Sequence, residues 1–220
     1  MNLALFGGTF DPIHRGHLAI ARAARRRFRL DRVYFMPADI PPHKQQAPVS
    51  AYEHRYAMVA LATAKEKGFV PSLLDAPRSG PSYSIETVRR VRRTLPKSAR
   101  LFFLIGIDAF RDLGTWREPE ALLREVEFIV VSRPGFVLAD VVAALPEPLR
   151  AQAAAVASGK AARRSLVFPG VTLHLLDGIA ENVSATQVRQ AVARGRSIAK
   201  LVDPAVAEYI SKLGLYRGKS

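Results

Sequence analysis

The chain of 220 residues contains no cysteine, only one tryptophan and far fewer acidic than basic side chains. Without cysteine, disulfides and thiolate metal sites are excluded, and a reducing compartment is favoured. No apolar run approaches the roughly 18 residues of a membrane span. The amino terminus also lacks the basic start and apolar stretch of a signal peptide. These absences together predict a cytoplasmic protein with no membrane partner.

The excess of 33 basic over 19 acidic residues gives a formal net charge of +14. Such a surface attracts nucleic acid, anionic membranes or small anionic ligands, and a genomic bias toward arginine would give the same composition. Arg22, Arg25, Arg26 and Arg29 would share one face of a helix. No aromatic residues alternate with them and no nucleic-acid module is recognisable, so we interpret them as a solvated face.

Short apolar runs alternate with helical patterns along the chain. Strands are predicted at 3–6, 33–36, 69–74, 101–105, 128–131 and 171–176, and helices at 17–29, 50–67, 84–94, 117–124, 184–195 and 204–213. An Ala-rich stretch at 138–164 is predicted to be helical and carries no motif. The alternation predicts an α/β fold, a Rossmann-like parallel sheet with helices on both faces. We expect a single domain, 1–220, with a small helical C-terminal part from about 184.

Ligands of such sheets bind beyond the carboxyl ends of the strands, which places the site at 7–17, 106–108 and 132–135. Three helix starts also carry capping signals. Ser50 with Glu53 and Ser184 with Gln187 match the capping-box spacing, and Ser84 is a single capping candidate.

The densest chemical cluster follows the first strand. It reads Gly7-Gly8-Thr9-Phe10-Asp11-Pro12-Ile13-His14-Arg15-Gly16-His17. The glycines let backbone N–H groups approach a ligand, and His17 falls at a helix start, where an anion is favoured. This pattern predicts a phosphate pocket with two histidine donors. A tight turn with ordinary histidines and a zinc site are the alternatives, although no third zinc ligand is apparent.

This cluster resembles the first signature of the HxGH nucleotidyltransferase superfamily. The second signature, a hydroxyl-rich helix start that ends in arginine, is matched by Val183-Ser184-Ala185-Thr186-Gln187-Val188-Arg189. The commoner form has serine where Ala185 stands, so one hydroxyl is missing.

Further segments resemble the bacterial nicotinate-nucleotide adenylyltransferases within that superfamily. They are Pro41 to Lys44, Pro81 to Ser84, Ile105 to Asp108, Leu113 to Trp116, Arg133 to Gly135, Tyr209-Ile210 and Gly214 to Tyr216. The resemblance covers nearly the whole chain in the expected order, except for about 138–165.

The resemblance implies transfer of the adenylyl group of ATP to nicotinate mononucleotide. The products would be nicotinate adenine dinucleotide and pyrophosphate, in NAD biosynthesis. The implied partners are these small molecules, with Mg²⁺ carried by ATP and without a protein metal ligand. No nucleic-acid partner is implied, and a homo-oligomer is compatible with the resemblance.

The resemblance also implies a role for each site residue. His14 and His17 would be catalytic, and ATP would contact Gly8, Thr9, Phe10, Gly106, Asp108, Arg133, Ser184, Thr186 and Arg189. Nicotinate mononucleotide would contact Lys44, Tyr83, Ser84 and Trp116. For Lys44, Arg133 and Trp116 the alternatives are a solvated lysine, a surface salt bridge and a packing aromatic.

Two alternative functions remain at this point. Related transferases use phosphopantetheine, nicotinamide mononucleotide, glycerol phosphate or flavin mononucleotide as acceptor, and the first signature does not separate them. A non-catalytic, basic nucleotide- or RNA-binding protein would show salt-sensitive RNA binding and no pyrophosphate release.

Overall fold

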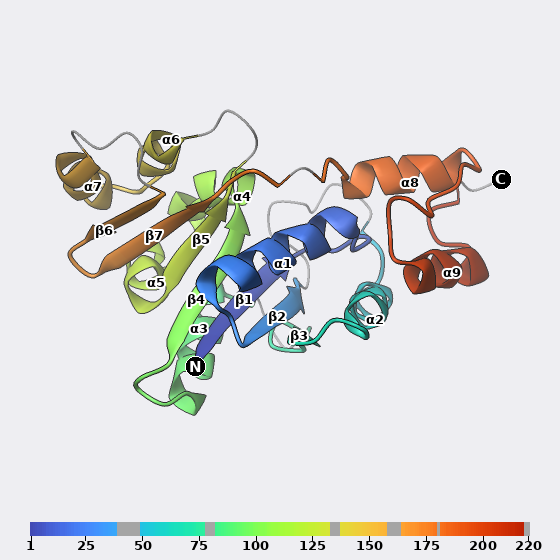
Figure 1. The fold of residues 1–220 in the computed structure, drawn as a ribbon, viewed down its shortest axis with the longest axis horizontal. Helices are drawn as coiled ribbons and strands as arrows, with labels where there is room; N and C mark the ends of the chain where they lie inside the picture. Colours follow the sequence, from blue (N-terminus) through green and yellow to red (C-terminus); the bar gives the residue numbers. More distant parts are fainter. Residues whose placement is uncertain (39–48, 78–81, 133–136, 158–163, 180, 218–220) are drawn as a thin grey trace.

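The computed structural model describes residues 1–38, 49–77, 82–132, 137–157, 164–179 and 181–217. Seven strands in these residues form one sheet in the order β3-β2-β1-β4-β5-β7-β6 (Figure 1). The strands are β1 (Asn2–Gly8), β2 (Arg32–Pro37), β3 (Phe69–Pro71), β4 (Arg100–Gly106), β5 (Glu127–Val131), β6 (Ser165–Phe168) and β7 (Val171–Leu176). Neighbouring strands pair in parallel, except that β6 and β7 pair antiparallel.

Helices cover both faces of this sheet. They are α1 (Arg15–Phe28), α2 (Tyr52–Thr63), α3 (Ser84–Thr94), α4 (Ile107–Arg111), the 3-10 turn η2 (Leu113–Thr115), α5 (Pro119–Glu125), α6 (Leu138–Ala143), α7 (Leu149–Ala157), α8 (Ala185–Ala193) and α9 (Pro204–Leu213). Helices α3 to α7 bury apolar side chains against one face, and α1, α2, α8 and α9 against the other. Burial on both faces explains why β4 is apolar from Leu101 to Ile105.

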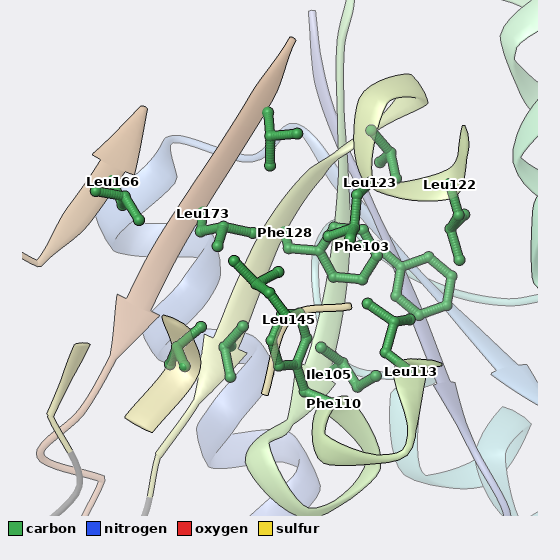
Figure 2. Close-up of a cluster of buried hydrophobic side chains, with 14 of the residues drawn as sticks. Phe103, Ile105, Phe110, Leu113, Leu122, Leu123, Phe128, Leu145, Leu166 and Leu173 are labelled. Carbon is green, nitrogen blue, oxygen red and sulfur yellow. The ribbon is translucent and has the colours of Figure 1, made fainter. Parts of the chain in front are cut away.

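Figure 2 shows the core on the α3–α7 face. Phe128 of β5 packs against Phe103 and Phe110, with ring centroids 5.4 and 5.7 Å away. Leu122 and Leu123 of α5 close the same cluster. This packed layer gives the strand ends above it a rigid support.

The order of the strands reverses at β1. The chain runs outward from β1 to β2 and β3, and then returns to β4 on the other side of β1. The connections after β1 and β4 therefore leave in different directions, and in open α/β sheets such a point is where ligands bind.

The predicted α/β fold is confirmed, with one strand that the prediction lacked. The Ala-rich segment ends before β6, which forms a hairpin with β7 around Pro169 and Gly170. Gly170 has a φ of +76°, a conformation that glycine adopts without strain. A Pro-Gly pair between two apolar runs was the available signal for this hairpin. The single domain with a helical part from about 184 stays a prediction.

Two of the three predicted caps are wrong. Helix α2 begins at Tyr52 after Ala51, and the backbone N–H of Ser50 is instead bonded to Asp11. Ser84 is the first residue of α3 rather than its cap, which is Tyr83. At Ser50 the contact with Asp11 takes the place of the predicted cap, and at Ser84 the helix begins one residue earlier than the capping pattern indicates.

Candidate active site

Both strands at the switch point end in glycine, Gly8 on β1 and Gly106 on β4. They lie two residues after Phe6 and Leu104, and therefore on the same face of the sheet, the one that α1 and α8 cover. A Cβ on Gly8 would lie 3.0 Å from the ring of Phe10, whereas one on Gly106 would meet no described atom within 4 Å. The ring of Phe10 therefore occupies the space beside Gly8, whereas no described atom occupies the space beside Gly106.

The loop between β1 and α1 is anchored from inside the protein. Phe10 is 2% exposed and packs edge-on against Phe6 and His17, with ring centroids 5.5 and 4.9 Å away. Its φ of +48° lies in the left-handed region, which is rare for an aromatic residue and needs support from its surroundings. Part of that support comes from the buried Arg55, whose Nη1 donates to the carbonyl of Thr9 at 2.9 Å.

His14 and His17 form a stacked pair at the N-terminus of α1, with ring centroids 3.7 Å apart. The backbone N–H of His14 donates to Nδ1 of His17 at 3.2 Å. Because Nδ1 accepts this bond, a neutral His17 carries its proton on Nε2. His17 therefore offers an Nε2–H donor at a helix N-terminus, where the backbone dipoles also favour an anion.

Both imidazoles are held in the neutral form. Burial lowers the pKa of His14 to about 4. Burial and the neighbouring His14 hold the pKa of His17 well below its usual range. The Nδ1 atom of His14 is buried and has no hydrogen-bond partner among the described residues. The pair can donate hydrogen bonds near neutral pH without bringing a full positive charge.

The second signature lies at the N-terminus of α8 and contacts the first. Ser184 caps α8: its hydroxyl accepts from the N–H of Gln187 at 3.2 Å, while its own N–H donates to Gln187 Oε1 at 2.8 Å. This predicted capping box is confirmed. A Cβ on Gly16 would lie 3.1 Å from the carbonyl oxygen of Val183, so glycine is needed where the two signatures touch.

Arg189 joins α8 to the β1–α1 loop. Its Nη1 donates to the carbonyl of Asp11 at 2.7 Å, and its Nη2 lies 3.4 Å from the hydroxyl of Thr186. The structure therefore brings His14, His17, Thr186 and Arg189 together although they are far apart in the sequence. Two helix N-termini and an arginine meet beside the switch point, an arrangement suited to phosphate groups.

Asp11 is the centre of a network that the sequence reasoning missed. It is 5% exposed, and its carboxylate accepts from the Tyr216 hydroxyl at 2.6 Å and from the Ser50 N–H at 3.3 Å. Arg55 continues the network by donating to the carbonyls of Ser50 and Ala38. Asp11 and Tyr216 both lie in segments that carried the resemblance, but the pattern alone did not show that they meet.

A shallow hollow of about 520 Å³ borders this network. It is lined by Val49, Ser50, Arg189, Gln190, Ala193, Tyr216 and Arg217. Arg189 and Tyr216 therefore each contact Asp11 and also line the hollow.

Three of the four residues expected to bind the acceptor, Tyr83, Ser84 and Trp116, lie on the other face of the sheet. Trp116 follows η2, is half-buried and packs edge-on against Phe103, with centroids 6.1 Å apart. Tyr83 precedes α3, and the guanidinium of Arg117 lies 4.6 Å from its ring centre. Tyr83 and Trp116 both pack on the α3–α7 core, and Ser84 opens α3.

Comparison with protein-family models gives a match to the family described as cytidylyltransferase-like, over residues 5–191. The match covers both signature segments and most of the sheet. The chain belongs to the cytidylyltransferase-like family. The predicted nucleotidyltransferase is thereby confirmed at the level of the family.

Within this cytidylyltransferase-like family, the similar curated proteins include several named "Probable nicotinate-nucleotide adenylyltransferase". That of Geobacter metallireducens is 42% identical over 217 residues, which cover 98% of each chain. That of Thermus thermophilus is 40% identical and covers 99% of this chain and 100% of its own. The resemblance stated from the motifs is confirmed.

Solved structures support the cytidylyltransferase-like fold. The Plasmodium falciparum nicotinic acid mononucleotide adenylyltransferase complexed with NaAD matches with a TM-score of 0.71, at 18% identity, over 98% of this chain and 97% of that one. A structure described as a putative nicotinate-nucleotide adenylyltransferase from Vibrio parahaemolyticus has a TM-score of 0.64, at 16% identity, with 99% and 96% covered. At these identities the likeness establishes the fold.

Three further site predictions concern Asp108, Lys44 and Arg133. Asp108 lies exposed in the first turn of α4, directly after β4. Lys44 and Arg133 lie outside the described residues. Within those residues, no group of three or more His, Asp or Glu side chains is arranged to hold a metal. No described helix has the length and apolar character to cross a membrane.

Proposed function

We propose that this member of the cytidylyltransferase-like family transfers the adenylyl group of ATP to nicotinate mononucleotide, as a step of NAD biosynthesis. The names of relatives about 40% identical over the full chain support this acceptor. The observation that carries the proposal is the meeting of His17, Arg189 and two helix N-termini at the switch point. The cysteine-free composition supports a reducing, cytoplasmic setting.

The proposed reaction is a displacement at the α-phosphorus of ATP by an anionic phosphate oxygen. A phosphate oxygen of nicotinate mononucleotide attacks the α-phosphorus of ATP. The bond from that phosphorus to the bridging oxygen then breaks, and pyrophosphate leaves with the electron pair. The attacking oxygen is already anionic near neutral pH, so no general base is needed. Catalysis then consists of positioning and of stabilising charge on the transferring group.

The histidine pair is placed to stabilise that charge. We assign the Nε2–H of His17 to an oxygen of the transferring phosphate and His14 to an adjacent phosphate oxygen. The backbone from Gly8 to Phe10 borders the same group. Because both imidazoles are neutral before ATP binds, they lose less hydration on binding than charged imidazolium groups would.

The leaving pyrophosphate is assigned to α8. The first N–H groups of a helix have no partner within it, and the Ser184 box satisfies that of Gln187 but not those of Ala185 and Thr186. These N–H groups, the hydroxyls of Ser184 and Thr186 and the remaining donors of Arg189 suit the β- and γ-phosphates. Arginine binds such oxygens in pairs.

Magnesium enters this proposal as part of the Mg–ATP substrate. Among the described residues no group of three or more His, Asp or Glu side chains could hold a metal, and the one carboxylate of the first signature, Asp11, accepts hydrogen bonds from Tyr216 and Ser50. Asp108 and Gly106, at the end of β4, are assigned to the ribose of ATP or to its metal–phosphate group.

The nicotinate half is assigned to the α3–α7 side of the sheet. Trp116 is the proposed stacking partner of the pyridine ring, and the first turn of α3, with Tyr83 and Ser84, is proposed to meet the carboxylate. Lys44 and Arg133 keep their predicted roles in phosphate and ATP contact.

Pyrophosphate release from Mg–ATP tests the proposal, with nicotinate mononucleotide and nicotinamide mononucleotide compared side by side. We expect release with the nicotinate form, with a strong preference over the amide. Release only with phosphopantetheine, glycerol phosphate or flavin mononucleotide would keep the family and overturn the acceptor. Salt-sensitive RNA binding without release from any acceptor would overturn the enzyme itself.

A further inference from the structure

Tyr216 returns from the C-terminal end of the chain to the β1–α1 loop. Helix α9 ends at Leu213, and the N–H groups of Gly214 and Leu215 bond back to its last turn. The chain then turns so that the Tyr216 hydroxyl donates to Asp11 Oδ1 at 2.6 Å. Asp11 lies three residues before His14, so this contact ties the loop that leads into α1 to a residue 205 positions later in the chain.

The backbone of Tyr216 adopts a conformation that is unusual for a tyrosine. Its φ is +62°, in the left-handed region, which is unfavourable for a side chain with a Cβ. Its ring is mostly buried, and burial together with the bond to Asp11 raises the pKa of the phenol well above its usual range. The hydroxyl therefore stays protonated and remains a donor to the carboxylate.

Asp11 connects Tyr216 to the elements that are proposed to bind phosphate. Its side chain is held by Tyr216 and Ser50, and its carbonyl accepts from Arg189 at 2.7 Å. His14 follows three residues later in the chain. A rotation of Asp11 would thus move Arg189 and the histidine pair relative to each other.

We infer that Tyr216 is a positioning residue for ATP, whose hydroxyl holds Asp11 so that the histidine pair and Arg189 face one triphosphate. This rests on the proposed function, in which those residues bind ATP. Simple packing of the C-terminal segment would be served as well by phenylalanine. A buried hydroxyl paired with a buried carboxylate instead fixes one geometry.

Tyr216→Phe removes only the hydroxyl and keeps the ring, so it is the central variant. Tyr209→Phe is its matched control, because Tyr209 on α9 shares a 3.0 Å hydrogen bond with His54 Nδ1 of α2, and no hydrogen bond among the described residues joins it to the β1–α1 loop. We expect Tyr216→Phe to raise the KM for ATP roughly tenfold, as the loss of a bond to a charged group would, with the KM for nicotinate mononucleotide changed less than about twofold. Tyr209→Phe should leave both values near those of the unaltered chain.

Equal changes in both KM values, or the same loss of ATP use in Tyr209→Phe, would show a general structural role and overturn the inference. A second pair of variants tests the coupling. Asp11→Ala combined with Tyr216→Phe should lose little more than Asp11→Ala alone, because each single change already removes the hydrogen bond between the two side chains. Losses that multiply would mean that the two residues act separately.

A measurement without turnover keeps this inference separate from the proposed function. Imidazole ¹⁵N signals of His14 and His17 should shift in Tyr216→Phe and stay in place in Tyr209→Phe, and the dissociation constant for Mg–ATP should rise only in the former. If the unaltered chain released no pyrophosphate with any acceptor, the proposed function would fail. The ATP affinity and the histidine signals would still decide the role of Tyr216, and unchanged values of both would overturn it.

Discussion

Histidines lie at both ends of α1, and they differ in how fully their ring nitrogens are hydrogen-bonded. At its N-terminus, His14 and His17 stack on each other, and one ring nitrogen of His14 has no described partner. At its last residue, Phe28 packs against His174 of β7, whose Nδ1 lies 2.8 Å from the Ser165 hydroxyl and whose Nε2 lies 3.0 Å from Glu127. Both ring nitrogens of His174 are therefore paired, whereas Nδ1 of His14 keeps unused hydrogen-bonding capacity.

The charges at the two ends differ in the same way. Burial acts to raise the pKa of Glu127, but hydrogen bonds from His174 and Arg100 outweigh it and lower that pKa to about 2. Burial alone lowers the pKa of His14 to about 4. Hydrogen-bond partners stabilise the charge of Glu127 at one end, whereas burial suppresses the charge of His14 at the other.

Replacing the two histidines separately should give the largest contrast. We expect His17→Ala to lower turnover roughly a hundredfold or more, because it removes a donor to charge that develops in the transition state. His174→Ala should leave turnover within about twofold and lower the free energy of unfolding by roughly 1–3 kcal/mol, because Glu127 and Ser165 lose their partner. Steady-state kinetics and urea unfolding measure both. Near-normal turnover in His17→Ala would remove it from the proposed role.

Acid should weaken the two ends in different pH ranges. The folded-state pKa of His14, about 4, lies below the unfolded value near 6.5, so the unfolded state binds the proton first. Above pH 6.5 the neutral His14 takes nothing from the free energy of unfolding. As the pH falls from 6.5 through 4, the free energy of unfolding decreases by up to roughly 3 kcal/mol. For Glu127 the corresponding loss runs from about pH 4.5 down through about 2.

Urea unfolding at several pH values checks this ordering. His14→Gln should flatten the decline in unfolding free energy between pH 6.5 and 4, and Glu127→Gln should change it only at lower pH. An unaltered slope in His14→Gln would mean that His14 is not the group that titrates.

Exchanging arginine for lysine should change activity and stability less than the histidine replacements or acid. Arg189 contacts two groups with its fork, the Asp11 carbonyl and Thr186, while Arg100 binds both oxygens of Glu127 at 2.9 and 2.7 Å. We expect Arg189→Lys to raise the KM for ATP roughly tenfold although the charge is kept. Arg100→Lys, at a half-exposed surface pair, should cost at most about 1 kcal/mol of stability and leave kinetics unchanged. Matching kinetic effects in both variants would contradict the assignment of Arg189 to ATP.

Local patterns in the sequence determined the alternation of strands and helices, the Gly-rich loop after β1 and the cap of α8. Each depends on residues within a few positions of one another, so a short window contains the physical cause. The same windows failed at Ser50, where the contact with Asp11 replaces the expected cap, and at β6, whose pairing with β7 defines it as a strand.

Only the tertiary structure decided which groups meet. The contacts of Tyr216 with Asp11, of Arg55 with Thr9 and of His174 with Glu127 join residues 205, 46 and 47 positions apart. They arise because the sheet places β5 beside β7, and because α2 and the C-terminal helices pack over the same face as α1. The histidine on β7 is therefore paired with Glu127 and Ser165, whereas Nδ1 of His14 has no described partner.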